Sequence, residues 1–368
     1  MNRRVLSIAA SLEGIFCQAA QAQAQKASPG PTPPPAASAA PMIRNHSVWK
    51  DTKGNPIDCH EGAILRVDAR YYWYGRSYHG NVKGIYGTGG AKFRCGLNCY
   101  SSSNLVDWTF EGNVLSYPDS GWITEGTWHR PRVLFNKKTS TYVLWFFCLG
   151  IPDGKPWVKD VVAVSNRPSG PFTILGDRKT GVDASGDLAL FEDVDGQGYL
   201  ANGDWGRNGF IQRLTADFRD TTGAPVKVLP AGGNHSYEGL SMARYKGKYL
   251  YAGSGVAGLD PSDTTYAVAD APMGPYTVKG LMSEQKTWSS QISSFCHIPE
   301  TDTLFALCEQ WLTGPDGQKV TAEASTQLWL PVSFDPVTGI ARMQYTRQWA
   351  PRLPQSQQPA ARETPGTK

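Results

Sequence analysis

The chain has 368 residues with a formal net charge of +4, and 18% of them are charged while 11% are aromatic. Low charge with this aromatic content excludes an intrinsically disordered protein, and scattered basic residues without a Lys/Arg block argue against a nucleic-acid partner. The sequence contains no apolar run of about 18 residues, so it predicts no membrane span.

The N-terminus has the features of an export signal. Met1–Arg4 is charged, Val5–Ala20 is mostly apolar, and small residues suited to cleavage follow. A Pro/Ala-rich stretch after the signal cannot form a core and should be a disordered linker. We therefore expect a secreted or periplasmic protein, with a signal peptide at 1–24, a linker at 25–42, a globular domain at 43–351 and a disordered tail at 352–368.

One pattern recurs five times along the globular part. An apolar strand is followed by a turn and a second strand rich in Tyr, Trp and Leu. The copies are 62–75, 130–147, 187–203, 238–255 and 291–308. Further strand pairs follow several copies, at 99–112, 162–176 and 266–280. Four strands per unit predict an all-β fold, a five-bladed β-propeller with four-stranded antiparallel blades. A sandwich or a barrel does not explain the repeated internal order.

In a propeller the first strand of each blade lines the central channel, so the residues at the heads of these strands converge on one pocket. In chain order these heads are Glu61, His129 with Arg130, Asp187, Glu238 and Gln291. Clustered carboxylates repel when ionised, so one of them should remain protonated at a raised pKa. A protonated carboxyl facing an ionised one is the equipment for glycoside hydrolysis.

Several further residues are candidates for contact with a sugar. Aromatic rings stack on the C–H faces of sugars, and five tryptophans lie near strand ends: Trp73, Trp128, Trp205, Trp288 and Trp311. His60, His129 and Arg130 are candidate substrate contacts, and the alternative for the two histidines is a structural histidine with satisfied hydrogen bonds. We expect no metal at the catalytic residues and no required cofactor.

Six cysteines remain if Cys17 leaves with the signal peptide, and export would place them in an oxidising compartment. Cys296 and Cys308 flank a predicted hairpin and are our first choice for a disulfide. Cys95 and Cys99 are spaced to close a small loop, with a zinc site as the alternative.

The chain resembles glycoside hydrolase family 43, and within it the exo-β-1,3-galactanase branch. The resemblance runs from about Val48 to Trp349 and is carried by HEGAILRVDARYYWYG, CYSSSNLVDWTFEG, HRPRVLFNKKTSTYVLW, DLALFEDVDGQGYL, EGLSMARYKGKYLYAGSG, SSQISSF and QLWLPVSF. It implies a five-bladed propeller that inverts the anomeric centre. Members typically use an Asp base on blade one, an Asp that tunes a pKa on blade three and a Glu acid on blade four.

Carried over residue by residue, the resemblance makes Glu238 the general acid and Asp187 the pKa modulator. Glu61 falls at the base position, where most of the family has Asp and the galactanase branch usually has Gly. That branch is thought to use a Gln on blade five, which Gln291 matches. His129 stands where the branch has a substrate-binding Glu.

The resemblance implies an exo-acting, inverting glycosidase on galactan or arabinogalactan, and we expect it to act as a monomer on a polysaccharide or oligosaccharide. An α-L-arabinofuranosidase or β-xylosidase is the alternative within the family. Rivals from other classes are a non-catalytic sugar-binding propeller and a scaffold for protein partners. For water activation we favour Glu61 as base and Gln291 as a substrate contact, with a water-orienting Gln291 as the alternative. Some relatives bind calcium at the propeller centre, so a structural Ca²⁺ is a further expectation.

Overall fold

The structure is a computed structural model that describes residues 41–78, 96–116, 123, 126–150, 155–232, 235–257 and 260–353. The predicted signal peptide at 1–24, most of the linker and most of the tail lie outside the described residues. Among the residues described, no helix is both long enough and apolar enough to cross a membrane.

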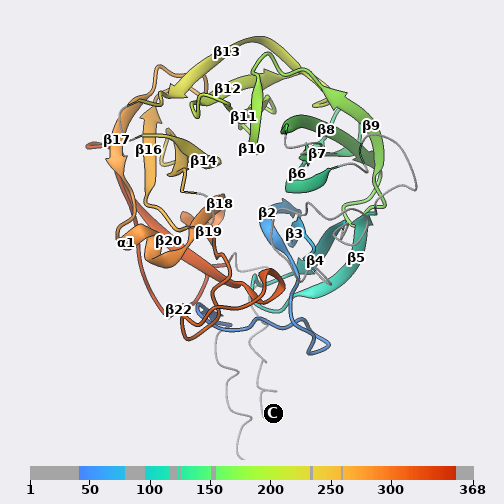
Figure 1. The fold of residues 1–368 in the computed structure, drawn as a ribbon, viewed down its shortest axis with the longest axis vertical. Coiled ribbons are helices and arrows are strands. Elements are labelled where there is room, and N and C mark those ends of the chain that lie inside the picture. Colours follow the sequence, from blue (N-terminus) through green and yellow to red (C-terminus); the bar gives the residue numbers. More distant parts are fainter. Residues whose placement is uncertain are drawn as a thin grey trace, which may run out of the picture. The chain divides into compact units, whose positions relative to one another are not determined.

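The predicted five-bladed propeller is confirmed. Five four-stranded antiparallel sheets, each built from consecutive strands, lie in a ring with β2, β6, β10, β14 and β18 innermost (Figure 1). Blade 1 contains β2 (His60–Val67), β3 (Arg70–Arg76), β4 (Leu97–Ser102) and β5 (Thr109–Leu115). Blade 2 contains β6 (Thr127–Asn136), β7 (Thr141–Gly150), β8 (Trp157–Ser165) and β9 (Thr173–Arg178).

The remaining three blades repeat this order. Blade 3 contains β10 (Ala184–Glu192), β11 (Gly198–Asp204), β12 (Gly209–Leu214) and β13 (Thr221–Leu229). Blade 4 contains β14 (Tyr237–Tyr245), β15 (Lys248–Gly255), β16 (Thr264–Ala269) and β17 (Thr277–Leu281). Blade 5 contains β18 (Gln291–Ile298), β19 (Thr303–Gln310), β20 (Thr326–Asp335) and β21 (Ile340–Met343). The described helical elements are α1 (Gln285–Ser289) and short 3₁₀ turns at Pro299–Thr301 and Ala322–Ala324.

The two ends of the propeller domain pair with each other outside the blades. β1 (Ile43–Arg44) lies antiparallel to β22 (Gln348–Trp349), with Ile43 opposite Trp349. Asn45 ties this pair to blade 5, because its Nδ2 donates to the Trp329 carbonyl at 2.9 Å and its Oδ1 accepts from the Trp329 N–H at 2.8 Å. The ring is therefore closed by packing and by this small sheet, and no blade is shared between the ends.

Turn chemistry explains the tight inner hairpins. Lys246 and Gly247 join β14 to β15 with φ values of 48° and 78°, the positive pair that suits the twist of a two-residue hairpin. In the β10–β11 turn, Gly196 takes a φ of 81°, which a residue without a Cβ adopts at little cost. These turns lie at the end of the propeller opposite to the strand heads.

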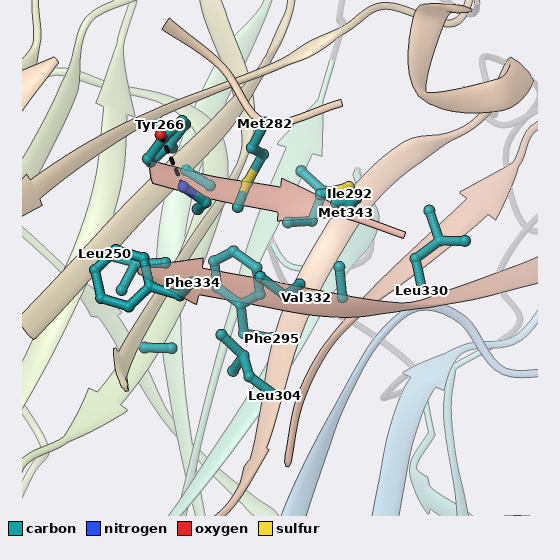
Figure 2. Packing of buried hydrophobic residues seen from close by; sticks show 14 of the residues in the cluster. Leu250, Tyr266, Met282, Ile292, Phe295, Leu304, Leu330, Val332, Phe334 and Met343 are labelled. Carbon is teal, nitrogen blue, oxygen red and sulfur yellow. Dashed lines mark hydrogen bonds between the residues drawn. The ribbon is translucent and has the colours of Figure 1, made fainter. Parts of the chain in front are cut away.

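The core consists of layers between neighbouring blades. Successive residues of a strand point to opposite faces of its sheet, so each blade packs against both neighbours. Figure 2 shows one such layer between blades 4 and 5, where Leu250, Ile292 and Phe334 are buried. Burial of these side chains supplies the main favourable free energy of folding.

The same alternation makes the predicted Cys296–Cys308 disulfide wrong. In the β18–β19 hairpin, Cys296 lies opposite Phe305 and Cys308 lies opposite Ile292. Cys296 packs between blades 5 and 1, whereas Cys308 packs between blades 4 and 5, so the two thiols are on opposite faces of one sheet. Both are free, as is the buried Cys99. Cys95 lies outside the described residues.

Candidate active site

Each innermost strand is irregular near its head. The pairing register shifts between His60 and Ala63, His129 and Arg132, Ala184 and Leu188, Glu238 and Ser241, and Ile292 and Ser294. Glu61, Arg130 and Asp187 take positive φ values of 53°, 50° and 49°. Such a conformation costs a non-glycine residue roughly 1–3 kcal/mol and is concentrated at functional sites. The bulges re-aim these side chains toward the channel.

Glu238 is the carboxyl most suited to donate a proton. Its side chain is buried, and its Oε1 accepts a hydrogen bond from Gln291 Nε2 at 2.8 Å. Burial raises the pKa of Glu238 to about 7, and the nearby negative charge of Asp187 acts in the same direction. Arg130 and Arg207 oppose the rise. The carboxyl is therefore partly protonated near neutral pH, as a general acid requires.

Arg130 connects the residues around Glu238. Its Nε donates to Asp187 Oδ1 at 2.6 Å, and its Nη2 donates to Gln291 Oε1 at 2.5 Å. Trp311 Nε1 donates to the same Gln291 oxygen at 3.3 Å. Arg130 Nη1 is buried and has no hydrogen-bond partner in the described structure. A guanidinium held on two sides with one free donor is suited to bind a substrate oxygen.

Glu61 lies beside this group, but its carboxylate is already occupied. Its oxygens accept from Tyr78 Oη at 2.5 Å, from His129 Nδ1 at 3.0 Å and from the Arg130 backbone N–H at 3.1 Å. Arg76 Nη1 lies 3.4 Å away. Burial alone would raise the pKa of Glu61, but the neighbouring His129, Arg76 and Arg130 hold this pKa well below its usual range.

The geometry therefore argues against Glu61 as the base, the role that we favoured from the sequence. A carboxylate that is 2% exposed, with several donors on its two oxygens, has little capacity to take a proton from water. Its contacts with the Arg130 N–H and His129 instead fix the bulge from which the Arg130 side chain projects.

The contacts of the two histidines within the protein favour the structural alternative over substrate contact. His129 is buried, and its Nδ1 is hydrogen-bonded to Glu61 while its Nε2 lies 2.8 Å from Thr127 Oγ1. Its ring stacks on that of Phe147, with 4.8 Å between the ring centroids. His60 is also buried and lies between the carboxylates of Asp58 and Glu309. Burial would lower the pKa of His60, but these two carboxylates raise it to about 10.

The five predicted tryptophans divide into two groups. Trp311 lies in the site, with its ring 5.9 Å from the Arg130 guanidinium, and Trp205 is 40% exposed in the β11–β12 turn. Trp73 and Trp128 are fully buried between blades, so neither reaches a substrate. Trp288 stacks on Tyr345, which follows the outermost strand of blade 5, and thus points away from the channel. For Trp73, Trp128 and Trp288, these positions argue against substrate contact.

A guanidinium occupies the channel below the site. Arg132 Nη1 donates to the carbonyls of Glu61 at 2.7 Å and Pro131 at 2.9 Å, and its Nη2 donates to the Ser293 carbonyl at 2.8 Å. These carbonyls come from β2, β6 and β18, and they already bind a cation supplied by the chain. These three carbonyls are thus not free to bind a Ca²⁺ ion, and the described residues contain no cluster of three His, Cys, Asp or Glu ligands.

Sequence reasoning missed several residues at this face. Arg76 ends β3 opposite His60, and Glu309 near the end of β19 lies opposite Gln291. Glu309 Oε2 accepts the Glu61 N–H at 2.8 Å, which links blades 1 and 5. A signal existed, because in an antiparallel hairpin the end of the second strand meets the head of the first.

Comparisons with known proteins agree with this geometry. The model of Glycosyl hydrolases family 43 matches residues 54–305. A solved family 43 β-1,3-galactosidase bound to galactodeoxynojirimycin is 25% identical with a TM-score of 0.73, covering 84% of this chain and 100% of that chain. A variant of the exo-β-1,3-galactanase of Phanerochaete chrysosporium, solved with β-1,3-galactotriose, is 27% identical with a TM-score of 0.72, covering 85% and 69%.

A curated protein is also similar over part of the chain. It is a β-xylosidase of Xylanibacter ruminicola, 30% identical over an alignment of 161 residues, with a coverage of 33% of this chain and 48% of that protein. The match thus spans about half the length of that relative. The family model, in contrast, covers more than half of this chain and includes the strand heads from Glu61 to Gln291. The chain therefore belongs to Glycosyl hydrolases family 43.

Proposed function

We propose that this protein is an exo-acting, inverting glycosidase that releases galactose from β-1,3-linked galactan or arabinogalactan chains. The observation that carries the proposal is Glu238, a buried carboxyl with its pKa raised to about 7, held against Gln291 and close to Asp187 and Arg130. The structural neighbours described as β-1,3-galactosidase and exo-β-1,3-galactanase support the sugar and the exo mode. We further propose that the protein acts outside the cytoplasm, as the predicted signal peptide at 1–24 indicates.

Glu238 protonates the glycosidic oxygen as the bond to the anomeric carbon breaks, and the electron pair leaves with that oxygen. Water attacks the opposite face of the sugar, which inverts the configuration. We assign the Gln291 amide to hold this water, because the Glu61 carboxylate already accepts hydrogen bonds from Tyr78, His129 and the Arg130 N–H. Gln291 Nε2 donates to Glu238 at 2.8 Å, and Gln291 Oε1 already accepts from Arg130 Nη2 and Trp311 Nε1. The amide therefore orients the water without acting as its base, and the proton that the water loses passes to solvent.

The pKa of Glu238 predicts the pH dependence of the reaction. Because the acid must be protonated, kcat/KM on an oligosaccharide should fall as the pH rises through about 7, approaching tenfold per pH unit. Asp187 helps to raise this pKa, so Asp187→Asn should move the falling limb to lower pH. A pH profile of kcat/KM for both proteins checks this, and an alkaline limb in the same place for both would contradict it.

Membership of family 43 and the similarity to solved galactosidases show that the protein is a glycosidase. This excludes the two alternatives from other classes, a non-catalytic sugar-binding propeller and a scaffold for protein partners. Within the family, the similarity to a β-xylosidase keeps that activity as the second candidate. Aryl β-galactoside, β-xyloside and α-L-arabinofuranoside, offered in parallel, separate these activities. We expect the galactoside to give the highest kcat/KM, and a preference for the xyloside would favour the second candidate.

A further inference from the structure

The loop between β19 and β20 holds Trp311 beside the head of β18. Trp311 directly follows β19, which pairs with β18, and β18 begins at Gln291. The next residue anchors the loop, because the Leu312 N–H donates to Ser325 Oγ at 3.0 Å and the Leu312 carbonyl accepts the Val320 N–H at 2.9 Å. These bonds fix the start of the loop, so the backbone of Trp311 is held at the site.

The indole of Trp311 has a single polar atom, and the site uses it. Its ring packs edge-on against Tyr78, with 6.3 Å between the ring centroids, and lies 5.9 Å from the Arg130 guanidinium. Its Nε1 donates to Gln291 Oε1 at 3.3 Å. An indole N–H donates and never accepts, so the Gln291 atom that faces it has to be an acceptor.

Two donors determine which way the Gln291 amide points. An amide has an oxygen that accepts and a nitrogen that donates, so its orientation follows from its partners. The oxygen of Gln291 accepts from both Trp311 Nε1 and Arg130 Nη2. The reversed amide would set an NH₂ group against these two donors in a buried site, which is strongly unfavourable. The nitrogen is therefore directed to Glu238, where it donates to Oε1 at 2.8 Å.

This orientation suits the chemistry proposed for Glu238. A carboxyl that faces an N–H keeps its own proton for the glycosidic oxygen, and the same N–H stabilises the carboxylate once that proton has left. The reversed amide would offer its oxygen to the acid and would hold the proton away from the substrate. In the described structure Glu238 accepts one of the two Nε2 hydrogens of Gln291, which leaves the second for the attacking water.

We propose that Trp311 is a positioning residue, whose indole N–H fixes the Gln291 amide with its nitrogen toward Glu238. This proposal rests on the proposed function for the part that Gln291 plays in the reaction. The role differs from the sugar stacking that the sequence predicts for Trp311, because it depends on the N–H and not on the face of the ring. Trp311→Phe separates the two roles, since phenylalanine keeps an aromatic ring and removes the donor.

Steady-state kinetics on an aryl galactoside test this role. Trp311→Phe should lower kcat roughly threefold to tenfold, the scale of one hydrogen bond, with KM changed by less than about twofold. In a Gln291→Ala background the same substitution should change kcat by less than about twofold, because the N–H then has no amide to hold. A raised KM with an unchanged kcat, or an equal loss of kcat in the Gln291→Ala background, would overturn the proposal.

A matched substitution controls for the loss of an indole hydrogen bond elsewhere. Trp349 Nε1 donates to the Trp329 carbonyl at 2.9 Å, and this bond is also partly buried. It lies in the small sheet that joins the two ends of the propeller domain. Trp349→Phe should therefore leave kcat and KM unchanged, and a loss of kcat equal to that of Trp311→Phe would show a general effect of stability and overturn the positioning role.

Nuclear magnetic resonance gives a readout that does not depend on the sugar. The indole N–H signal of Trp311, identified by its loss in Trp311→Phe, should shift in Gln291→Ala. The pKa of Glu238, followed by its carboxyl carbon signal, should be higher in Trp311→Phe, because a freed amide donates less to the carboxylate that Gln291 now stabilises. An unchanged titration of Glu238 would overturn the proposal. Both shifts without hydrolysis of any galactoside would support the fixed amide and would instead overturn the proposed galactosidase function.

Discussion

Replacing Glu238 with Gln is expected to lower kcat/KM on a β-1,3-galactan oligosaccharide by at least about 100-fold, the usual scale of general acid catalysis. The amide keeps the size of the side chain and its place beside Gln291 but has no acidic proton for the departing sugar oxygen. An aryl galactoside with a good leaving group needs little protonation, so it should lose much less. Steady-state rates on the two substrates measure this difference.

A matched variant makes this result specific to the acid. Glu192 stands at the far end of β10, away from the strand heads, and Glu192→Gln should leave both rates within about twofold of the wild-type values. Equal losses on the two substrates in Glu238→Gln would show that Glu238 has a structural role or a binding role, and that another group donates the proton.

Replacing Gln291 with Ala is expected to lower kcat by about 100-fold or more, because we assign the attacking water to this amide. Gln291→Glu should retain more activity than Gln291→Ala, since a carboxylate accepts a proton directly. These rates are measured with the aryl galactoside, so that protonation of the leaving group contributes little to the result.

The companion experiment concerns Glu61, the base that the family pattern favours. Glu61→Ala should also lose activity, because it removes the acceptor that fixes the Arg130 N–H and His129. External azide should then fail to restore the rate, since the loss lies in the position of Arg130 and not in an absent base. Formation of a glycosyl azide of inverted configuration would restore Glu61 to the role of base.

The repeats in the sequence were sufficient to predict the propeller and the convergence of the strand heads. Each repeat contains a strand pair of similar length, and this pattern can be recognised without knowing how the strands pack. The sequence did not reveal which face of a sheet a residue occupies. The sequence therefore predicted Trp73 and Trp128 as sugar contacts near strand ends, although both are buried between blades. For the same reason, Cys296 and Cys308 were predicted to form a disulfide although they lie on opposite faces of one sheet.

The role of Glu61 was harder to predict because it depends on a bulge. His60, His129 and Glu238 are the last paired residues before the bulges of their strands, whereas Glu61, Arg130 and Asp187 occupy the irregular positions with positive φ. Counted back from the second strand, Glu61 lies ten residues before Tyr71, whereas Glu238 lies eleven residues before Tyr249. Glu61 is thus one residue further on than the acid, and the count alone does not show that its carboxylate accepts hydrogen bonds from His129 and the Arg130 N–H.

The stereochemistry of galactose release distinguishes an inverting mechanism from a retaining one. Proton NMR of the first minutes of reaction on a β-1,3-galactooligosaccharide identifies the anomer before mutarotation mixes the two forms. We expect galactose to be the single sugar released and its α anomer to appear first, with the β anomer growing later. Initial release of β-galactose, or of disaccharides in place of galactose, would contradict an exo-acting, inverting enzyme with Glu238 as its acid.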